Sequence, residues 1–508
     1  MAIKTLILRA DATVTMGTGH VMRCIALAQA FQDSGGAPVF AVCEATPAIE
    51  SRLRGEGAGI VRIPGPAGGR EDAERVIELV RERKSDWVVV DGYQFDSEYQ
   101  RRLKDSGVKL LVVDDYGHAR SYCADLVLNQ NLHASQDLYR EREVYTRILE
   151  GPKYALLRRE FSRRRDWTRE IPATANRVLV TMGGSDPENL TAKALQAVAA
   201  VRMNGVRCDV VVGGSNPHIN VLQRLAKDST AAVELHYDNV DMAELMARAH
   251  VAISAAGSTC WELCLLGLPA LLFDLAENQL PVAESLTQAG VAIHVGGKGG
   301  IDDRKVASEL ERVMKSHDLM STMSAKGRQL VDGRGCERVL AAMRRGRCVL
   351  RRAIRDDCRQ FWEWANEPEV REVSFASEPI PWKDHVKWFE EKLADPRFNL
   401  FVALDEASHP VGQVRYEIDG ESAVVSISLG REFRGMGMGL EMLELANREC
   451  MSGAAIRKIY AYVKPDNVAS LRLFESAGFT REGIAMVRGQ EAIRFVMEEW
   501  PRPEPSKK

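Results

Sequence analysis

The sequence predicts an α/β protein in three parts: two doubly wound halves with parallel sheets, then a smaller unit of mixed α+β type. Short apolar runs alternate with helical patterns over residues 5–114 and again over residues 177–275, which is typical of parallel strands covered by helices. From residue 349, alternating strand patterns follow one another before a glycine-rich loop and a helix. A length of 508 residues agrees with two or three domains.

Composition excludes several classes of protein. The 68 basic and 71 acidic residues give a net charge of −3, so nucleic acid is not an expected partner. Lys4 and Arg9 interrupt the apolar start, which therefore does not resemble a signal peptide, and no apolar run is long enough to span a membrane. The ten cysteines lack a disulfide-type or zinc-type spacing, which favours reduced thiols in a cytoplasm. Cys260 and Cys264 lie one helical turn apart without a second ligand pair, so we expect no metal.

The first half is expected over residues 1–160. It opens with a strand at residues 5–10 and a helix at residues 21–31. The elements that follow alternate in the same way, with strands at 37–43, 86–91 and 108–114 and helices at 71–83 and 96–104.

The turn Gly17-Thr18-Gly19-His20 joins the first strand to the first helix. Glycines at such a turn let the backbone approach a ligand closely, and the unpaired N–H groups of the helix start suit a diphosphate. The positive end of the helix biases the imidazole of His20 towards its neutral form. The residue types alone leave two interpretations open, a catalytic base and a structural histidine.

Polar clusters follow the later strands of this half. They occupy residues 91–96, 114–118 and 128–131. Because ligands bind beyond the carboxyl ends of parallel strands, we expect these loops to share one rim with His20. Aspartates in such loops also cap turns and helices, so both roles stay open.

Residues 158–175 read as a linker, and the second half is expected over residues 174–345. Its predicted strands lie at 177–182, 207–213, 232–236, 250–254 and 269–275. Small and hydroxyl-bearing residues at three strand ends suit a diphosphate, Glu262 could accept both hydroxyls of a ribose, and the amides of Asn278 and Gln279 could bind sugar hydroxyls or N-acetyl groups. The alternative is that these residues are helix caps.

Two such halves with facing polar rims resemble the two-Rossmann, GT-B type architecture of nucleotide-sugar glycosyltransferases. The ordered motifs are more specific: over residues 4–345 they are similar to the UDP-sugar hydrolase family of pseudaminic acid biosynthesis, which removes UDP from UDP-2,4-diacetamido-2,4,6-trideoxy-β-L-altropyranose. The motifs are Gly17-Thr18-Gly19-His20, the loop 91–96, Asn129-Gln130-Asn131, Gly183-Gly184-Ser185-Asp186, Ala256-Gly257-Ser258-Thr259 with Glu262, and Glu277-Asn278-Gln279.

The resemblance implies that His20 activates the reacting water, that Tyr93 lies near it, and that the anomeric carbon is inverted. UDP would leave towards backbone N–H groups of the second half, without a metal. The expected substrate-binding residues of the two halves are Gly17, Gly19, Asn129, Gln130, Gly184, Ser185, Ser254, Ala255, Gly257, Ser258, Thr259, Glu262, Asn278 and Gln279.

The third unit is expected over residues 348–500. Strands are predicted at 349–354, 400–404, 411–417, 423–429 and 458–463, and helices at 356–366, 382–393 and 440–450. The loop 434–439, Arg-Gly-Met-Gly-Met-Gly, resembles the pyrophosphate loop of the acetyl-CoA-dependent GNAT N-acetyltransferases, and a second signature of that family follows at residues 467–479. The resemblance implies acetyl-CoA as cosubstrate, with Arg434, Gly435, Gly437, Gly439, Asn467 and Ser470 as its binding residues.

Further motifs in this unit, among them Arg371, His385 and Trp388-Phe389, are similar to the acetyltransferase that modifies the 4-amino group of a UDP-amino sugar in the same pathway. Arg415 could bind the nucleotide phosphates or pair with Glu417. Of Trp364, Trp388 and Phe389, at least two are expected in the core.

Phe474 departs from the pattern of this family, in which many relatives carry a tyrosine that protonates the departing thiolate. Tyr462, water or the low basicity of the thiolate could replace that tyrosine, or the unit is impaired.

The resemblances together imply two consecutive reactions, acetylation of a UDP-amino sugar and then removal of UDP. One alternative is a UDP-sugar glycosyltransferase fused to an acetyltransferase, and another is a sensor of nucleotide sugar and acetyl-CoA without turnover. The stereochemistry of the sugar and the oligomeric state stay open.

Overall fold

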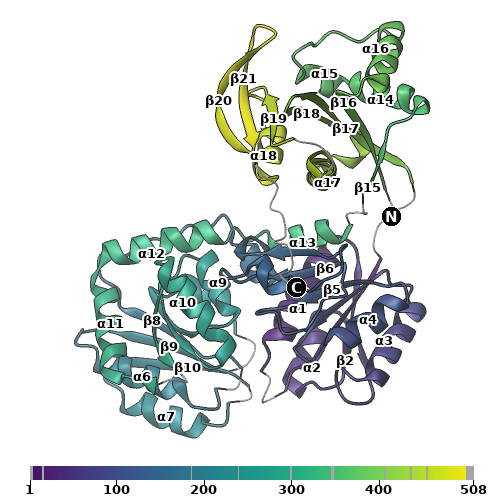
Figure 1. Ribbon diagram of the computed structural model, residues 1–508. Helices are drawn as coiled ribbons and strands as arrows, with labels where there is room; N and C mark the ends of the chain where they lie inside the picture. Colours follow the sequence, from purple (N-terminus) through teal and green to yellow (C-terminus); the bar gives the residue numbers. More distant parts are fainter. Residues whose placement is uncertain are drawn as a thin grey trace, which may run out of the picture. The chain divides into compact units, whose positions relative to one another are not determined.

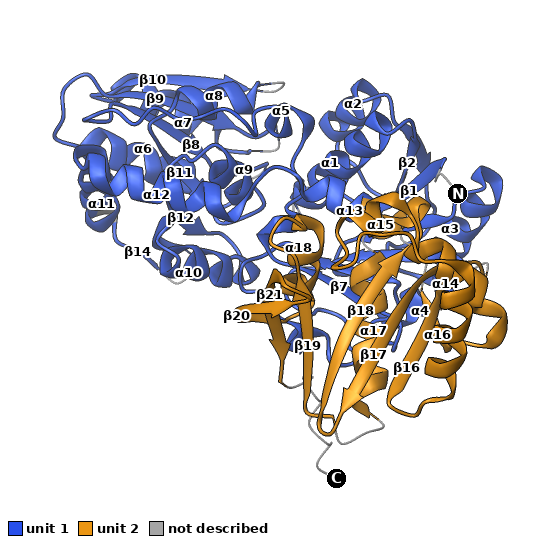
Figure 2. Cartoon of the chain, turned by 90° about the horizontal axis from the view of Figure 1, so that it is seen from above, with its two compact units in different colours: residues 1–340 blue, residues 341–508 orange. Residues whose placement is uncertain are grey.

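The computed structural model describes residues 4–13, 17–184, 186–214, 216–237, 240–297, 300–344, 348–405, 408–434, 438–452 and 456–498. The chain divides into two compact units, residues 1–340 and 341–508 (Figure 2). Unit 1 contains two seven-stranded sheets, and unit 2 contains one (Figure 1). Within the described ranges, no helix combines the length and the hydrophobicity that crossing a membrane requires.

The first sheet of unit 1 has the order β3-β2-β1-β4-β5-β6-β7, and all of its neighbouring strands are parallel. Its strands are β1 (Thr5–Ala10), β2 (Ala37–Val42), β3 (Gly59–Arg62), β4 (Trp87–Asp91), β5 (Lys109–Val113), β6 (Leu126–Asn129) and β7 (Arg147–Glu150). Its helices are α1 (Gly19–Asp33), α2 (Pro47–Gly55), α3 (Arg70–Arg83) and α4 (Ser97–Asp105), with 3-10 turns η1 (Gln136–Tyr139) and η2 (Pro152–Tyr154). The strand order reverses between β1 and β4, the point at which ligands bind in doubly wound sheets.

The second sheet repeats this order, β10-β9-β8-β11-β12-β13-β14, with only β14 antiparallel to its neighbour. Its strands are β8 (Arg177–Thr181), β9 (Arg207–Val212), β10 (Ala232–Tyr237), β11 (Val251–Ala255), β12 (Ala270–Asp274), β13 (Ala292–Gly297) and β14 (Gly300–Ile301). Its helical segments are α6 (Leu190–Ala200), α7 (Ile219–Asp228), α8 (Met242–Arg248), α9 (Thr259–Leu265), η3 (Glu277–Gln279), α10 (Leu280–Gln288), α11 (Asp303–Lys315), α12 (His317–Leu330) and α13 (Gly335–Arg344). The prediction of two doubly wound halves is confirmed.

The connection between the two sheets, predicted as a linker at residues 158–175, makes contacts with both halves. It contains the short helix α5 (Arg159–Ser162), and Phe161 is buried in the core of the second half. At one end, the backbone N–H of Arg159 donates to Gln29 Oε1 of α1 at 2.7 Å. At the other end, the guanidinium of Arg169 donates to the carbonyl oxygens of Met246 at 2.6 Å and Leu266 at 2.9 Å.

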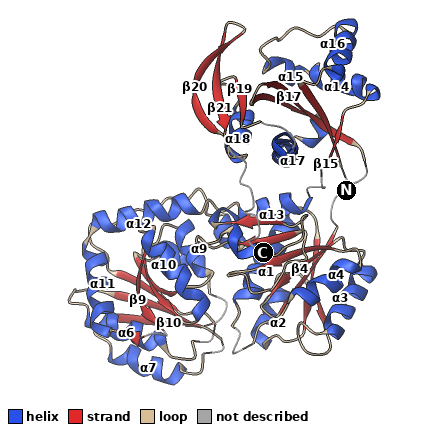
Figure 3. Ribbon diagram, viewed as in Figure 1, coloured by secondary structure: helices blue, strands red, loops and turns tan. Residues whose placement is uncertain are grey.

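Unit 2 has one mixed sheet of order β15-β16-β17-β18-β19-β21-β20 (Figure 3). Its strands are β15 (Val349–Arg352), β16 (Phe398–Leu404), β17 (Pro410–Asp419), β18 (Ser422–Leu429), β19 (Lys458–Val463), β20 (Thr480–Val487) and β21 (Gln490–Met497). Its helical segments are η4 (Arg355–Asp357), α14 (Cys358–Ala365), α15 (Pro368–Glu372), α16 (Trp382–Ala394), η5 (Arg431–Phe433), α17 (Met438–Ser452) and α18 (Val468–Ser476). The predicted α+β unit is confirmed.

The two central strands of this sheet separate along their length. β18 and β19 are parallel and pair only from Ser422 with Lys458 to Val424 with Tyr460, although β18 continues to Leu429. The remaining neighbours are antiparallel. The carboxyl ends of β18 and β19 therefore do not hydrogen-bond to each other, and α17 starts after β18 at this place.

Candidate functional site

Polar side chains from three neighbouring strand ends meet in the first half of unit 1. His20 lies in the first turn of α1 after β1, Asp91 is the last residue of β4, and Asp115 follows β5. These three strands are adjacent in the order β1-β4-β5. The prediction that loops 91–96, 114–118 and 128–131 share one rim with His20 is confirmed, because Asp91 contacts His20 and both Asn129 and Asn131 donate to Asp115.

His20 is fixed by a carboxylate. Its Nδ1 lies 2.6 Å from Asp91 Oδ1, and the histidine is 8% exposed. In a neutral imidazole whose Nδ1–H donates to a carboxylate, Nε2 carries the lone pair and can take up a proton. None of the described residues forms a hydrogen bond with Nε2. The arrangement is therefore able to perform base chemistry at Nε2.

Arg23 is a site residue that the sequence prediction missed. It lies one turn after His20 on α1 and is 6% exposed. Its Nε donates to Asp91 Oδ2 at 2.6 Å and its Nη2 donates to Asp91 Oδ1 at 2.7 Å, while Nη1 donates to Asp115 Oδ1 at 2.8 Å. The signal in the sequence is its spacing of three residues from His20, which places both side chains on one face of the helix.

The opposite charges of this cluster stabilise the ionised forms of Asp91, Asp115 and Arg23. Burial disfavours the charged form of Asp91 and of Asp115, but the nearby Arg23 and His20 outweigh it and hold the pKa of both carboxyls below the usual range. Burial likewise opposes the charge of Arg23, and the two carboxylates keep its pKa above the ordinary value. The cluster therefore consists of two carboxylates and one guanidinium at neutral pH.

Tyr93 connects this cluster to the second half of unit 1. Its hydroxyl donates to Asp115 Oδ2 at 2.8 Å and accepts a hydrogen bond of 2.7 Å from Asn278 Nδ2, which lies in η3 beyond the second sheet. The ring packs edge-on against His20, with centroids 5.0 Å apart. Burial and the charge of Asp115 raise the pKa of Tyr93, so the phenol is neutral. The structure thus brings together the three predicted residues His20, Tyr93 and Asn278.

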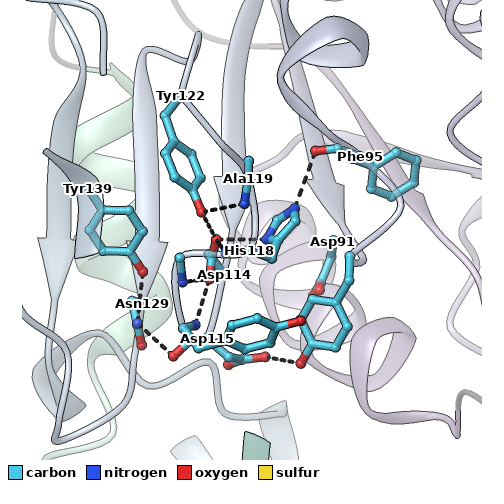
Figure 4. A network of polar contacts seen from close by, with 12 residues as sticks. Asp91, Phe95, Asp114, Asp115, His118, Ala119, Tyr122, Asn129 and Tyr139 are labelled. Atoms are coloured by element: carbon cyan, nitrogen blue, oxygen red, sulfur yellow. Dashed lines mark hydrogen bonds and ion pairs between the residues drawn. The ribbon is translucent and has the colours of Figure 1, made fainter. Parts of the chain in front are cut away.

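The carboxylate of Asp114 caps the loop that follows β5, whereas the carboxylate of Asp115 pairs with Arg23. The Asp114 carboxylate accepts backbone N–H groups of Tyr116 at 2.7 Å and Gly117 at 2.8 Å, and also contacts His118 Nδ1 at 2.8 Å and the hydroxyl of Tyr122 (Figure 4). Burial lowers the pKa of His118, but Asp114 outweighs it and raises the pKa overall. Of the two interpretations for these aspartates, Asp114 follows the structural one.

Asn129 and Gln130 hydrogen-bond to neighbouring loops of the rim. Asn129 is fully buried and its Nδ2 donates to the Asp115 carbonyl at 3.0 Å and to the Tyr139 hydroxyl at 2.8 Å (Figure 4). Gln130 is also buried, and its Oε1 accepts the backbone N–H of Leu156 at 2.9 Å. In this structure both amides are used to hold the loops in place, a role that the sequence did not predict.

The glycine turn of the first half lies against a glycine loop of the second half. A Cβ atom on Gly184 would lie 3.0 Å from the side chain of Thr18, and one on Gly213 would lie 2.3 Å from the Gly184 carbonyl. Gly17 has a positive φ of 81° that favours glycine. Ser185, predicted in the same loop, lies outside the described residues. Gly19 has open space beside it, where a Cβ would meet no atom within 4 Å.

The start of α9 carries the residues predicted to bind the diphosphate. Ser258 is the N-cap and makes no side-chain cap hydrogen bond to the first N–H groups of this helix, which begins at Thr259. Gly257 precedes it, and a Cβ there would lie 3.7 Å from Gln279 Nε2. Gln279 Oε1 accepts the backbone N–H of Leu275 at 2.9 Å. Ser254 and Ala255 are buried at the end of β11, where the Ser254 hydroxyl donates to the Ala255 carbonyl at 3.2 Å.

Glu262 has a protein partner that the sequence did not reveal. Its Oε1 accepts a hydrogen bond from Arg158 Nη2 at 2.9 Å, and Arg158 also pairs with Glu160 at 2.8 Å. Burial raises the pKa of Glu262 against the opposing charge of Arg158. A ribose at this place would therefore share the carboxylate with Arg158.

Of the cofactor-binding positions predicted in unit 2, Gly439, Asn467 and Ser470 lie in or at the start of α17 and α18. Gly435 and Gly437 lie outside the described residues, whereas Gly439 is in the first turn of α17, packed against Leu429. Arg434 forms ion pairs with Glu367 and, at 2.6 Å, with Glu369. Asn467 caps α18, its Oδ1 accepting the Ser470 N–H at 3.1 Å.

Arg415 lies on β17, and its guanidinium stacks over the ring of Trp388 at 5.3 Å. No carboxylate among the described residues lies within ion-pair distance of it, so the alternative pairing with Glu417 does not occur in this structure. Burial and the charge of Arg371 lower the pKa of Arg415.

Aromatic residues of unit 2 are mostly core. Trp364 and Phe389 belong to one buried cluster, and Trp388 lies at its edge, as predicted. Phe474 is buried, with ring centroids 5.2 Å from Phe479 and 5.9 Å from Phe495.

The cysteine pair of the second half is apolar in character. Cys260 and Cys264 are buried in one core cluster, and burial raises the pKa of the Cys264 thiol to about 12. Within the described ranges, one group of three potential metal ligands occurs, Asp209, Glu234 and His236, and Arg248 donates to its Asp209 at 2.9 Å.

Two family models match the chain. Residues 177–332 match the glycosyltransferase family 28 C-terminal domain, and residues 347–480 match the acetyltransferase (GNAT) domain. These ranges correspond to the second sheet of unit 1 and to most of unit 2.

Several proteins are similar to this chain. An uncharacterized protein of Methanocaldococcus jannaschii is 23% identical over 494 residues, 93% of this chain and 96% of its own length. The UDP-2,4-diacetamido-2,4,6-trideoxy-β-L-altropyranose hydrolase of Campylobacter jejuni is 26% identical over 292 residues, 57% of this chain and 98% of the hydrolase. The Bacillus subtilis protein YwnH, provisionally named a phosphinothricin acetyltransferase, is 30% identical over 120 residues, 22% of this chain and 72% of its own.

Among solved structures, the spermidine N-acetyltransferase of Vibrio cholerae in complex with coenzyme A and spermine aligns with a TM-score of 0.28 and 24% identity, covering 30% of this chain and 95% of that one. The family-model match and the similarity to YwnH show that the chain belongs, through its C-terminal unit, to the GNAT acetyltransferase family, and it joins that domain to an N-terminal unit similar to a UDP-sugar hydrolase.

Proposed function

We propose that the chain is a bifunctional nucleotide-sugar enzyme of pseudaminic acid biosynthesis. Unit 1 hydrolyses UDP-2,4-diacetamido-2,4,6-trideoxy-β-L-altropyranose to UDP and the free sugar. Unit 2 transfers an acetyl group from acetyl-CoA to the 4-amino group of the UDP-amino-sugar precursor. The observation that carries the first activity is the 2.6 Å contact of His20 with Asp91 at the point where the strand order reverses. The similarity to the Campylobacter jejuni hydrolase over nearly its full length supports the same reaction.

In the proposed hydrolysis, Nε2 of His20 removes a proton from water as its oxygen attacks the anomeric carbon. The bond from that carbon to the diphosphate oxygen breaks, and UDP leaves with the electron pair. Asp91 accepts the Nδ1–H and stabilises the imidazolium that forms. Attack opposite the leaving group inverts the anomeric centre. Tyr93, 5.0 Å from the His20 ring, borders the place of the reacting water.

UDP is proposed to lie towards the second half, against Gly184, Gly257, Ser258 and Thr259, where backbone N–H groups meet the charge of the leaving diphosphate. Support comes from the start of α9, whose N–H groups receive no side-chain cap from Ser258, and from Thr18 of the glycine turn, whose side chain lies where a Cβ of Gly184 would meet it at 3.0 Å. Glu262 and Arg158 would together face the ribose.

In unit 2, the amine of the acceptor attacks the thioester carbonyl of acetyl-CoA, and the carbon–sulfur bond breaks to release the CoA thiolate. The amine loses a proton in this reaction and the thiolate gains one. The Phe474 ring carries no proton to give, and it is buried between other aromatic rings. The proton that the thiolate gains would therefore come from Tyr462 on β19 or from water.

One coupled experiment tests both activities. The purified chain is given the UDP-4-amino sugar and acetyl-CoA, and mass spectrometry follows the products in time. We expect the acetylated UDP-sugar first, then free diacetamido sugar and UDP. Release of UDP without any acceptor alcohol separates a hydrolase from a glycosyltransferase. Absence of all turnover in a folded protein would overturn the proposal in favour of a sensor.

A further inference from the structure

The buried guanidinium of Arg23 is linked through Asp91 to His20 and through Asp115 to Tyr93, the two groups that would border the reacting water. Arg23 donates two hydrogen bonds to Asp91, from Nε at 2.6 Å and from Nη2 at 2.7 Å, which fix the plane of this carboxylate. Asp91 Oδ1 is also the oxygen that contacts His20 Nδ1 at 2.6 Å. The orientation of the imidazole is therefore set by the Arg23 fork, which a lysine ammonium cannot reproduce.

The remaining nitrogen of the Arg23 guanidinium, Nη1, acts on Tyr93 through Asp115. Nη1 donates to Asp115 Oδ1 at 2.8 Å, and Asp115 Oδ2 accepts the Tyr93 hydroxyl at 2.8 Å. Asn131 Nδ2 adds a hydrogen bond of 3.0 Å to Asp115 Oδ1. Both oxygens of Asp115 are thus occupied, and the hydroxyl of Tyr93 is held in one orientation.

The charge balance around His20 depends on Arg23. The ionisable groups in contact with the imidazole or joined to it through a polar contact of one residue are Asp91, Arg23, Tyr93, Asp115 and Cys24, whose thiol donates to Asp91 Oδ2 at 3.7 Å. The rings of Tyr116 and His118 lie beyond Tyr93, with centroids 5.0 Å and 5.7 Å from its own. Two carboxylates and one guanidinium leave one net negative charge. Without the guanidinium, two negative charges would favour the protonated imidazole, and the base would be lost at a higher pH.

We propose that Arg23 is a positioning residue that orients His20 through Asp91 and Tyr93 through Asp115, and that its charge offsets one of the two carboxylates around the imidazole. This inference rests on the proposed hydrolysis. It adds the residue that holds His20 and Tyr93 in place for that reaction.

The test compares variants that change the charge in opposite directions. In Arg23→Gln the positive charge is lost, so the acid limb of kcat against pH should move up by about one pH unit or more. In Asp115→Asn a negative charge is lost, so the same limb should move down. In Arg23→Lys the charge is restored but the fork is not, so the limb should return towards its original position while the plateau of kcat stays about 10-fold lower or more.

Arg9 offers a matched control. It is a fully buried arginine of the same sheet whose side chain pairs with two aspartates, Asp72 at 2.8 Å and Asp11 at 2.7 Å. Arg9→Lys should lower the melting temperature about as much as Arg23→Lys and leave the acid limb in place. An unmoved limb in folded Arg23→Gln, a shift of equal sign in Asp115→Asn, or an equal shift in Arg9→Lys would overturn the inference.

A second readout does not need turnover. In ¹⁵N spectra of the histidine rings, the His20 signal is identified by its loss in His20→Gln. We expect the Nδ1-protonated tautomer in the native chain and the opposite tautomer or a mixture in Arg23→Lys. An unchanged tautomer would contradict the positioning role. Failure of the native chain to release UDP would contradict the proposed hydrolysis alone, because the spectra still decide the inference.

Discussion

The side-chain amide of Asn278 donates a 2.7 Å hydrogen bond to the phenol oxygen of Tyr93, and this bond joins the two α/β halves of unit 1. Asn278 lies 185 residues after Tyr93, in the segment that follows β12. Tyr93 in turn is tied to Asp115 and packs on His20. Asn278, from the half proposed to bind the nucleotide, therefore contacts Tyr93, which packs against the proposed base His20.

Removal of this amide should weaken substrate binding more than chemistry. In Asn278→Ala the Tyr93 hydroxyl keeps its bond to Asp115, so we expect kcat to change little and KM for the UDP-sugar to rise up to about 10-fold, the effect of one hydrogen bond. Steady-state assays of UDP release measure both constants. Asn204→Ala, at an exposed position of the second half, is the control. An unchanged KM would contradict the prediction.

Replacement of the proposed base should separate binding from turnover. Asparagine can occupy the place of His20 but cannot take up a proton at neutral pH, so His20→Asn should reduce UDP release by about 10²-fold or more. Calorimetric titration with UDP should give nearly the native affinity, because the nucleotide is proposed to bind the second half. Turnover comparable to that of the native chain would rule out His20 as the base.

The carboxylate cluster should make unit 1 sensitive to acid. The pKa values of Asp91 and Asp115 lie below their usual range in the folded state. Their contribution to stability is therefore fully present above the unfolded carboxyl pKa of about 3.9 and is lost as the pH falls through the folded values. Urea unfolding between pH 6 and pH 3, followed by fluorescence, should show this loss. Asp115→Asn should flatten the dependence, and an unaltered slope in this variant would contradict the assignment.

A tyrosine at position 474 should not improve the acetyltransferase. The Phe474 ring is buried against Phe479 and Phe495, so a hydroxyl added there is buried without an evident partner and should cost about 1–3 kcal/mol of stability. We expect Phe474→Tyr to lower the melting temperature and leave the release of CoA thiol, measured by a thiol reagent, no faster. Faster release would show that the hydroxyl reaches the thiolate after all.

Arg415 should distinguish the two substrates of unit 2. It stacks on Trp388 and forms no ion pair with any described carboxylate, so its charge is available to an anionic acceptor. Arg415→Gln should raise KM for the UDP-amino sugar and leave KM for acetyl-CoA unchanged. Arg352→Gln, at an exposed arginine of β15 that also stacks on an aromatic ring, is the control. Equal effects on both substrates would indicate a structural role instead.

Much of the fold is visible in the sequence for a physical reason. Parallel strands are buried on both faces, so they appear as continuous apolar runs, and β1 occupies the predicted residues. The short edge strands β3 and β7, only partly buried, lack such a run and were not predicted. The polar composition of residues 158–175 predicts a linker, but the arginines there donate to distant carbonyl groups, which no local pattern reveals.

The site was predictable where the chemistry lies in a local motif. The glycine turn predicts His20, and the strand ends predict Tyr93 and Asn278, which the structure brings together. Arg23 and Arg158 were missed because their partners lie 68 and 104 residues away, at Asp91 and Glu262. Within the apolar helix α1, only the spacing of three residues from His20 points to Arg23, and the sequence does not show which carboxylates it meets.

The short connection between the two sheets of unit 1 determines how much the hydrogen bond between Asn278 and Tyr93 can contribute to holding the halves together. Arg159 is bound to α1, and Phe161, two residues later, is already buried in the core of the second half, so the tether between the two halves is very short. A tether this short gives the two halves a high effective concentration towards each other, so that contact between them is an intramolecular event with a small entropic cost. The bond between Asn278 and Tyr93 therefore need not supply the affinity of an interface; it only has to select one of the few orientations that the tether allows.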